Sequence, residues 1–301
     1  MNTTKHICPL CDYIYDDLKG DLDLGISPGT KFDRLPDDFT HSDCSATTDM
    51  FESCTCVQVE SSAELVRKDL MRQALSTLIS KYPCFAKVFD KYDLDYCCIG
   101  NISLSDACRL QDLKAENVVD ELIEASIGIC QTQKDDASVQ GIIRDIVSEH
   151  HSQLAEELPE ISMMIEALLT KHKQDNTSIK DTSDLFQQLK DELEQHIEKE
   201  RMILFPLCVD FDKEPIPLRK LKDPLAVLEH EHFKIHNSLR KIRTILNDYD
   251  ESLPDRCDLH SKLVNRLRKF ESNMHLHIHK ENNILFPMVI EKSLLAELRA
   301  Y

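Results

Sequence analysis

The chain has 301 residues, a length that allows two or three domains and at least one sizeable hydrophobic core. Its formal net charge is −18 and it has no block of Lys and Arg, which argues against nucleic acid or an anionic membrane as a partner. No apolar run approaches the roughly 18 residues of a membrane span, and the first residues lack the apolar core of a signal peptide, so we expect a cytoplasmic protein.

Glycine is scarce, with six residues, and amphipathic patterns are long, so we predict a mainly α-helical fold. We expect three domains, at residues 1–56, 64–130 and 138–298. Twelve cysteines in a cytoplasmic chain indicate metal or redox chemistry rather than a disulfide framework. Five of them fit scattered thiols that are buried without a chemical role: Cys84, Cys108, Cys130, Cys208 and Cys257.

Residues 1–56 are rich in turns and too few to build a large core, so we expect a metal to stabilise them. The Cys8-Pro-Leu-Cys11-Asp-Tyr-Ile-Tyr pattern, the Gly-Ile-Ser-Pro-Gly-Thr segment and the Leu-Pro-Asp-Asp-Phe segment resemble rubredoxin over residues 6–52. That resemblance implies a single metal with four ligands. The second cysteine pair of rubredoxins is replaced here by His41-Ser-Asp-Cys44.

The resemblance therefore implies the ligand set Cys8, Cys11, His41 and Cys44. Three cysteines and one histidine are an ordinary zinc set. If the site holds iron, a neutral imidazole in place of a thiolate should raise its reduction potential. One iron or one zinc both fit, so electron transfer and a structural role stay open.

The helical pattern that begins near Glu64 continues to a helix that we expect to end near Gly100, just after the adjacent Cys97 and Cys98. Adjacent cysteines bond each other only with strain. They could bind iron, form an easily reduced disulfide, or be two small buried apolar residues.

The segment Phe-Asp-Lys-Tyr-Asp-Leu-Asp-Tyr-Cys-Cys at 89–98 resembles the short N-terminal domain of the iron-centre repair (RIC) family. In that family the domain precedes a hemerythrin-like bundle that holds two irons. The paired cysteines are usually followed by two glycines there, and by Ile99-Gly100 here.

Four helical patterns follow, and they predict a four-helix bundle with helices at about 138–173, 182–209, 221–247 and 257–292. We expect Pro159 to disturb the first helix. The second and fourth patterns contain a duplicated segment in which His196 precedes Glu200, and His277 precedes Glu281, by four residues.

In both copies the His and Glu lie on the apolar stripe that should face the core. A buried carboxylate without a partner costs several kcal/mol, so it must be paired or bind a metal. Two helices that each offer an imidazole and a carboxylate to one core indicate a dinuclear metal site. Carboxylates paired with Lys or Arg at the surface are the alternative, which the register disfavours.

Histidines elsewhere in the bundle vary in how clearly they face the core. His232 is the polar member of the stripe from Leu221 to Leu246, whereas His230 should be solvated and His236 lies at the margin. His150 and His151 both fit helical steps, so periodicity does not choose between them. We expect two histidines that flank His277 to lie at the surface, namely His275 and His279.

The RIC resemblance implies metal ligands at His151, His196, Glu200, His232, His277 and Glu281, with His172 as a further candidate. These residues suit two irons, with both carboxylates as bridges.

By resemblance, the function would be repair of iron–sulfur clusters damaged by nitrosative or oxidative stress, through the supply of iron. Cys97 and Cys98 would be the thiol pair for iron transfer. Expected partners are damaged iron–sulfur proteins or cluster-assembly proteins and an electron donor, and a homodimer is left open. One alternative is a di-iron reductase of nitric oxide or peroxide, fed by the rubredoxin-like domain. The other is a hemerythrin-like carrier or sensor of O2.

Overall fold

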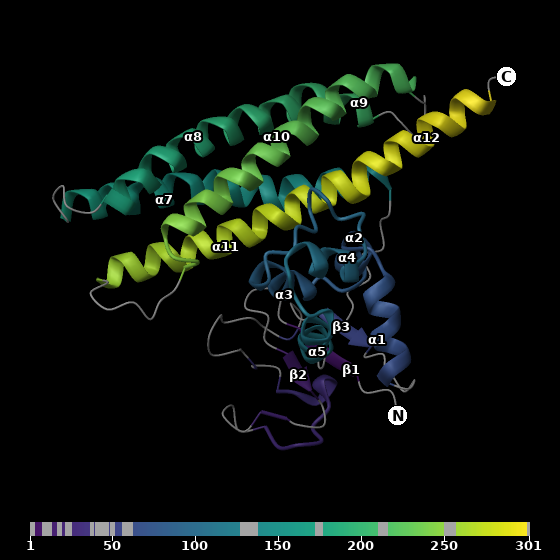
Figure 1. Cartoon of the computed structure of the whole chain (residues 1–301). Helices are drawn as coiled ribbons and strands as arrows, with labels where there is room; N and C mark the ends of the chain where they lie inside the picture. The colour runs from purple at the N-terminus through teal and green to yellow at the C-terminus, as the bar shows by residue number, and fades with distance from the viewer. Residues whose placement is uncertain are drawn as a thin grey trace. The chain divides into compact units, whose positions relative to one another are not determined.

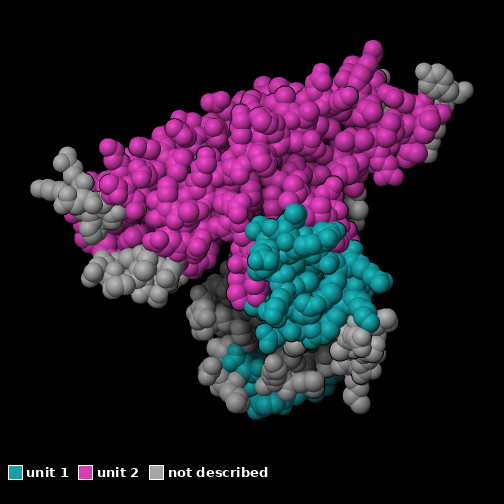
Figure 2. Space-filling view, viewed as in Figure 1, with its two compact units in different colours: residues 1–73, 78–88, 104–135 teal, residues 74–77, 89–103, 136–301 magenta. Residues whose placement is uncertain are grey.

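The computed structural model describes residues 4–7, 14–16, 20–21, 26–36, 39, 48, 52–55, 63–126, 138–171, 177–209, 216–249 and 257–299. The chain divides into two compact units (Figure 2): residues 1–73, 78–88 and 104–135 form the first, and residues 74–77, 89–103 and 136–301 the second. The mainly helical fold predicted from the sequence is confirmed. The three domain boundaries stay predictions. No helix in these ranges is both long and apolar enough to cross a membrane.

The first unit contains a small antiparallel sheet in which β1 (Thr4–Ile7) lies between β2 (Ile14–Asp16) and β3 (Glu52–Thr55). Lys5 pairs with Asp16 on one side and with Cys54 on the other. Its small core consists of Tyr15, Ile26, Leu35 and Phe39, packed against Phe32 of the 3₁₀ helix η1 (Phe32–Arg34).

Three helices of the first unit pack on one another: α1 (Ala63–Arg72), α4 (Leu104–Leu110) and α5 (Ala115–Ser126). Two short helices, α2 (Leu75–Lys81) and α3 (Phe85–Lys91), contribute residues to both units. The helix expected to end near Gly100 ends at Lys91, so that prediction was wrong. Asp93 takes a left-handed backbone with φ +53°, and the N–H of Leu94 donates to the carbonyl of Phe89, which closes the helix early.

The second unit contains the four-helix bundle (Figure 1). The first helix consists of three consecutive segments: α6 (Val139–Asp145), η3 (Ile146–His151) and α7 (Ser152–Lys171). The second helix consists of α8 (Thr177–Lys199), η4 (Glu200–Leu204) and α9 (Phe205–Val209). The third helix is α10 (Leu218–Ile245), and the fourth consists of α11 (Asp258–Lys280), η5 (Glu281–Leu285) and α12 (Phe286–Arg299). Contacts run from α7 to α8, α8 to α10, α10 to α11 and α11 back to α7, so the four helices enclose one core.

Two helices differ from the sequence prediction. The first continues through Pro159, because buried Leu158, Ile161 and Ile165 pack on both sides of the missing hydrogen bond. The second begins at Thr177 rather than near residue 182. Within its first turns the Thr182 hydroxyl donates a hydrogen bond to the carbonyl of Ser178. The segments η3, η4 and η5 are π-helical turns, a form that is rare in proteins and frequent at functional sites.

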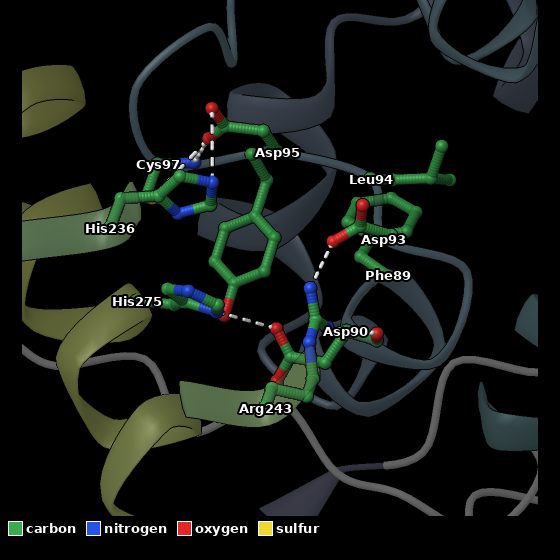
Figure 3. A pocket seen from close by; sticks show the side chains of 10 residues that line it. Phe89, Asp90, Asp93, Leu94, Asp95, Cys97, His236, Arg243 and His275 are labelled. Carbon is green, nitrogen blue, oxygen red and sulfur yellow. Dashed lines mark hydrogen bonds and ion pairs between the residues drawn. The ribbon is translucent and has the colours of Figure 1, made fainter. Parts of the chain in front are cut away.

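Residues 89–103 belong to the second unit and are held to α10 and α11 by polar contacts. Arg243 pairs with Asp93, and its Nε atom lies 3.7 Å from Oε1 of Glu271. Nδ1 of His275 lies 2.8 Å from Oδ1 of Asp90 (Figure 3). The paired cysteines are therefore fixed against the bundle.

Candidate metal centre

Six polar side chains from all four helices meet in the core of the bundle. His151 ends the π-helical turn η3, while Glu200 and Glu281 begin the turns η4 and η5. His196 lies in α8, one turn before Glu200, and His277 lies in α11, one turn before Glu281. Each of these five side chains, and His232 of α10, is at most 7% exposed. The six residues implied by the RIC resemblance are therefore brought together.

The six side chains form two groups of four that share both carboxylates. Glu200 points Oε2 at Nε2 of His151, 3.2 Å away, and Oε1 at Nε2 of His196, 3.1 Å away. Glu281 points Oε1 at Nε2 of His277, 3.2 Å away, and Oε2 at Nε2 of His232, 2.9 Å away. Each carboxylate thus offers one oxygen to each group, which is the arrangement of a bridge between two ions.

The charges of this cluster fit a metal. Burial alone would raise the pKa of Glu281, but His277 and His232 hold it well below its ordinary value, so this carboxylate is ionised. Burial also disfavours a charged His196, yet Glu200 raises its pKa to about 10. Two fully buried carboxylates thus require positive charge from their neighbours. Imidazole nitrogens and carboxylate oxygens are ligands that iron accepts.

Two of the four imidazoles are oriented by hydrogen bonds from their other ring nitrogen. Nδ1 of His196 donates to Oε2 of Glu231 at 3.0 Å, and Lys199 also pairs with Glu231. The hydrogen bond from His196 lowers the pKa of Glu231 to about 2. Nδ1 of His232 lies 2.7 Å from Oδ1 of Asn282. Since both Nδ1 atoms donate, it is the Nε2 atom of each ring that faces the cluster and is left for a metal.

The other two imidazoles are oriented by ring packing. His151 stacks on Phe205 with 5.7 Å between centroids, and His277 stacks on His150 at 5.2 Å. Their Nδ1 atoms are buried, with no hydrogen-bond partner among the described residues. The two histidine pairs therefore differ in what surrounds them.

The structure separates the two histidines that periodicity left equivalent. Both are buried, but Nδ1 of His150 lies 2.7 Å from Oδ1 of Asn273, whereas Nε2 of His151 lies 3.2 Å from Nε2 of His277 inside the cluster. Burial lowers the pKa of His150 to about 3, so its ring is neutral at pH 7.

The expectation that His275 and His279 lie at the surface was wrong, because they are 5% and 2% exposed. Residues 89–103 cover the face of α11 that carries them. Asp90 contacts His275, and the backbone of Tyr96 contacts His279. His236 is likewise buried, while His230 is exposed as predicted.

Cys97 and Cys98 are free thiols whose sulfurs lie 3.7 Å apart, too far for a disulfide. Cys97 is buried and Cys98 is half-buried. Cys8, Cys11, His41, Cys44, Cys130 and His172 lie outside the described residues.

Glu231 and Asn282 both touch metal-ligand candidates, and neither was predicted from the sequence. Glu231 precedes His232, and Asn282 follows Glu281, so each lies off the apolar stripe and looks like a solvated residue. Their nearness in sequence to the candidate ligands is the signal that could have found them.

Comparison with known proteins adds three family matches. Residues 142–289 match the hemerythrin HHE cation binding domain, residues 5–51 match rubredoxin, and residues 71–126 match a domain of unknown function, DUF542. The first two matches point to iron binding.

Curated relatives match over most of the chain. A probable iron-sulfur cluster repair protein of Haemophilus influenzae is 29% identical over 227 residues, which cover 73% of this chain and 98% of that protein. The iron-sulfur cluster repair protein YtfE of Escherichia coli O8 is 28% identical over 218 residues, or 72% of this chain and 96% of YtfE. Together, the three domain matches and these relatives support the resemblance to the iron-centre repair (RIC) family of hemerythrin-like proteins, with a rubredoxin-like domain at the N-terminal end.

Proposed function

We propose that this protein repairs iron–sulfur clusters damaged by nitrosative or oxidative stress, and that its buried centre holds two irons as the store. The observation that carries the proposal is the pair of carboxylates, each shared between two histidine pairs. The relatives named as cluster repair proteins support it. Iron held there would supply exchangeable, redox-active metal.

The residues divide the work between two ions. His151 and His277 would hold one, and His196 and His232 would hold the other. Glu200 and Glu281 would offset the positive charge of both ions. Carboxylate ligands exchange more readily than thiolates, so both ions would stay exchangeable. The set Cys8, Cys11, His41 and Cys44 would hold one iron or zinc.

Cys97 and Cys98 are proposed to transfer iron between this store and a damaged iron–sulfur protein or a cluster-assembly protein. Their position supports this role, because the carbonyl of Cys97 accepts from Nδ2 of Asn282, 3.1 Å away, while Oδ1 of the same amide faces His232. One side chain thus joins the thiol segment to a ligand of the store.

The test is anaerobic recovery of an iron–sulfur dehydratase that nitric oxide has damaged, with the iron-loaded chain as the only iron source. We expect Glu200→Gln to lose iron and recovery together, since an amide neither bridges two ions nor offsets their charge. Glu198→Gln, exposed on the same helix, is the matched control. Recovery by Glu200→Gln at the wild-type rate would contradict the proposal.

A second experiment addresses the thiols. The double variant Cys97→Ser, Cys98→Ser should keep its iron content while cluster recovery slows. Recovery at an unchanged rate would remove these cysteines from the proposed transfer step.

The rubredoxin match favours a second candidate, reduction of nitric oxide or peroxide at the same centre with electrons from the N-terminal domain. Stopped-flow reduction tests it. An electron placed on the N-terminal metal must reach the buried centre faster than turnover, and failure to do so would eliminate this candidate.

A further inference from the structure

We infer that Asp95, Cys97, Cys98 and His236 form a further metal site, which binds one divalent transition-metal ion through two sulfurs, one imidazole and one carboxylate. One ligand atom from each residue lies within 4.8 Å of the other three. All four residues belong to the second unit. None of them contributes to the two groups that share Glu200 and Glu281.

The spacing of the ligand atoms fits a tetrahedral ion. Such an ion, with metal–sulfur bonds of about 2.3 Å, holds its ligand atoms roughly 3.8 Å apart. The sulfurs of Cys97 and Cys98 lie 3.7 Å apart, and the Cys97 sulfur lies 3.7 Å from Nδ1 of His236. Oδ2 of Asp95 lies 3.7 Å from the other ring nitrogen of His236, Nε2. Only one of the two nitrogens can bind a given ion, so the fit rests on the 4.8 Å limit that one atom from each of the four residues meets. Small movements of these side chains would complete the coordination.

The backbone holds the two sulfurs on the same side. Oδ1 of Asp95 accepts from the N–H of Cys97 at 3.1 Å and from the N–H of Cys98 at 2.8 Å. These bonds curl the chain around the carboxylate, so adjacent side chains converge instead of pointing apart. Oδ2 of Asp95 stays directed at His236, as Figure 3 shows. The turn therefore presents three potential ligands to one imidazole.

The chemistry of the four donors selects the class of ion. Two thiols, an imidazole and a carboxylate suit Fe²⁺, Zn²⁺ or Co²⁺ better than Mg²⁺ or Ca²⁺, which prefer oxygen. Burial raises the pKa of the Cys97 thiol well above its ordinary value, so it is protonated at pH 7. A bound cation stabilises the thiolates, and each bound ion would release the two thiol protons to solvent.

The site adjoins a pocket that is open to solvent, and one amide connects it to the buried centre. Cys98 and Asn282 line an open pocket of about 490 Å³. His236 follows His232 by one helical turn on α10, and Asn282 contacts both Cys97 and His232. This position suits an iron ion in transit, a role that rests on the proposed function. Metal binding at these four residues does not rest on it.

The experiment is an anaerobic titration of the reduced, iron-loaded full chain with Co²⁺, followed by absorption. We expect one further equivalent, with sulfur-to-cobalt charge transfer and the visible bands of a tetrahedral ion. Iron is supplied beforehand only in the amount that fills the bundle and the N-terminal site, so that the four residues of this site stay open to Co²⁺. Loss of a ligand in His236→Gln should weaken Co²⁺ binding by more than the roughly 10- to 100-fold typical of outer contacts. His230→Gln, an exposed histidine on the same helix, should bind as the wild type does.

Three outcomes would overturn the assignment. In the first, titration of the wild type with Co²⁺ gives no sulfur-to-cobalt charge-transfer band. The double variant Cys97→Ser, Cys98→Ser could keep the band, which would place it on other cysteines. Finally, His236→Gln and Asp95→Asn could both bind at wild-type affinity, which would reduce the site to a thiol pair. Iron content and circular dichroism of each variant check that its fold is intact, and cluster recovery, measured separately, reports on the proposed function alone.

Discussion

Glu231 is not itself a metal-ligand candidate, but it orients one of them, His196, through a hydrogen bond. Its carboxylate accepts from Nδ1 of His196, which keeps Nε2 of that ring directed at Glu200 and His232. The low pKa of Glu231, about 2, means that it stays ionised throughout the physiological range. The fixed negative charge makes the imidazole a better donor to a cation.

We therefore expect Glu231→Ala to weaken iron binding about 10- to 100-fold without unfolding the bundle. Competition with a coloured chelator measures the change. Glu229→Ala, exposed on the same helix, is the control and should match the wild type. Equal affinity in the two variants would show that the hydrogen bond does not tune the ligand.

The thiols also differ in reactivity in a way that burial explains. Burial raises the pKa of Cys108 to about 11 and that of Cys208 to about 12, so at pH 8 roughly one Cys208 in ten thousand is a thiolate. Iodoacetamide should label the half-buried Cys98 before it labels Cys208. Labelling of Cys208 should rise about tenfold per pH unit, because the thiolate fraction does. Peptide mass spectrometry follows both, and rapid labelling of Cys208 at pH 8 would contradict this account.

The metal-ligand candidates that lie on the bundle stripe could be predicted from the sequence, because helical periodicity reports which residues face the axis of their own bundle. His196, Glu200, His232, His277 and Glu281 all meet that condition. Periodicity did not identify His275 or His279 as buried, because a second segment, residues 89–103, covers their face of α11. Burial that comes from a distant part of the chain leaves no periodic mark on the helix that it covers.

At the scale of elements, the same limit applies to the turn that carries the thiols. The sequence predicts a helix that ends near Gly100, because glycine commonly ends helices, but Asp93 breaks the helix earlier through a left-handed backbone. The π-helical turns could not be predicted from the sequence either, because one extra residue in a turn hardly alters the apolar stripe of a helix. Element types were thus predictable, whereas their interruptions depend on tertiary contacts.

Gly100 has a steric role in this turn. A Cβ atom at this position would lie 2.2 Å from the carbonyl oxygen of Tyr96 and 3.0 Å from Cβ of Ser76. Gly100→Ala should therefore displace the thiol turn and destabilise the second unit by roughly 1–3 kcal/mol. Urea unfolding measures the loss, with Ile99→Ala, at a position 44% exposed, as the control. A stability equal to that of the control would mean that the turn relaxes freely.

At the scale of the whole molecule, the metal-ligand candidates of the bundle and the thiol turn all belong to the second unit. The Haemophilus relative is 98% covered by a match that spans 73% of this chain, so a related protein exists without the equivalent of a quarter of it.

We expect a chain that lacks residues 1–62 to keep the same iron content in the bundle as the full chain. Removal of residues 1–135 should instead lower stability, because it strips the cover from His275 and His279. Elemental analysis and thermal unfolding of both truncated chains provide the test. Loss of bundle iron in the shorter deletion would show that the N-terminal domain supports the centre.

Asn282 couples the buried metal-ligand candidates to the thiol turn. Its amide accepts a hydrogen bond from Nδ1 of His232 and donates one to the carbonyl of Cys97, so neither group can move without disturbing the other. Coupling of this kind is reciprocal: whatever factor an ion in the bundle exerts on affinity at the thiols, an ion at the thiols exerts on the bundle. Iron binding in the bundle would then change the metal affinity of the half-buried thiol turn, through the side-chain amide of Asn282.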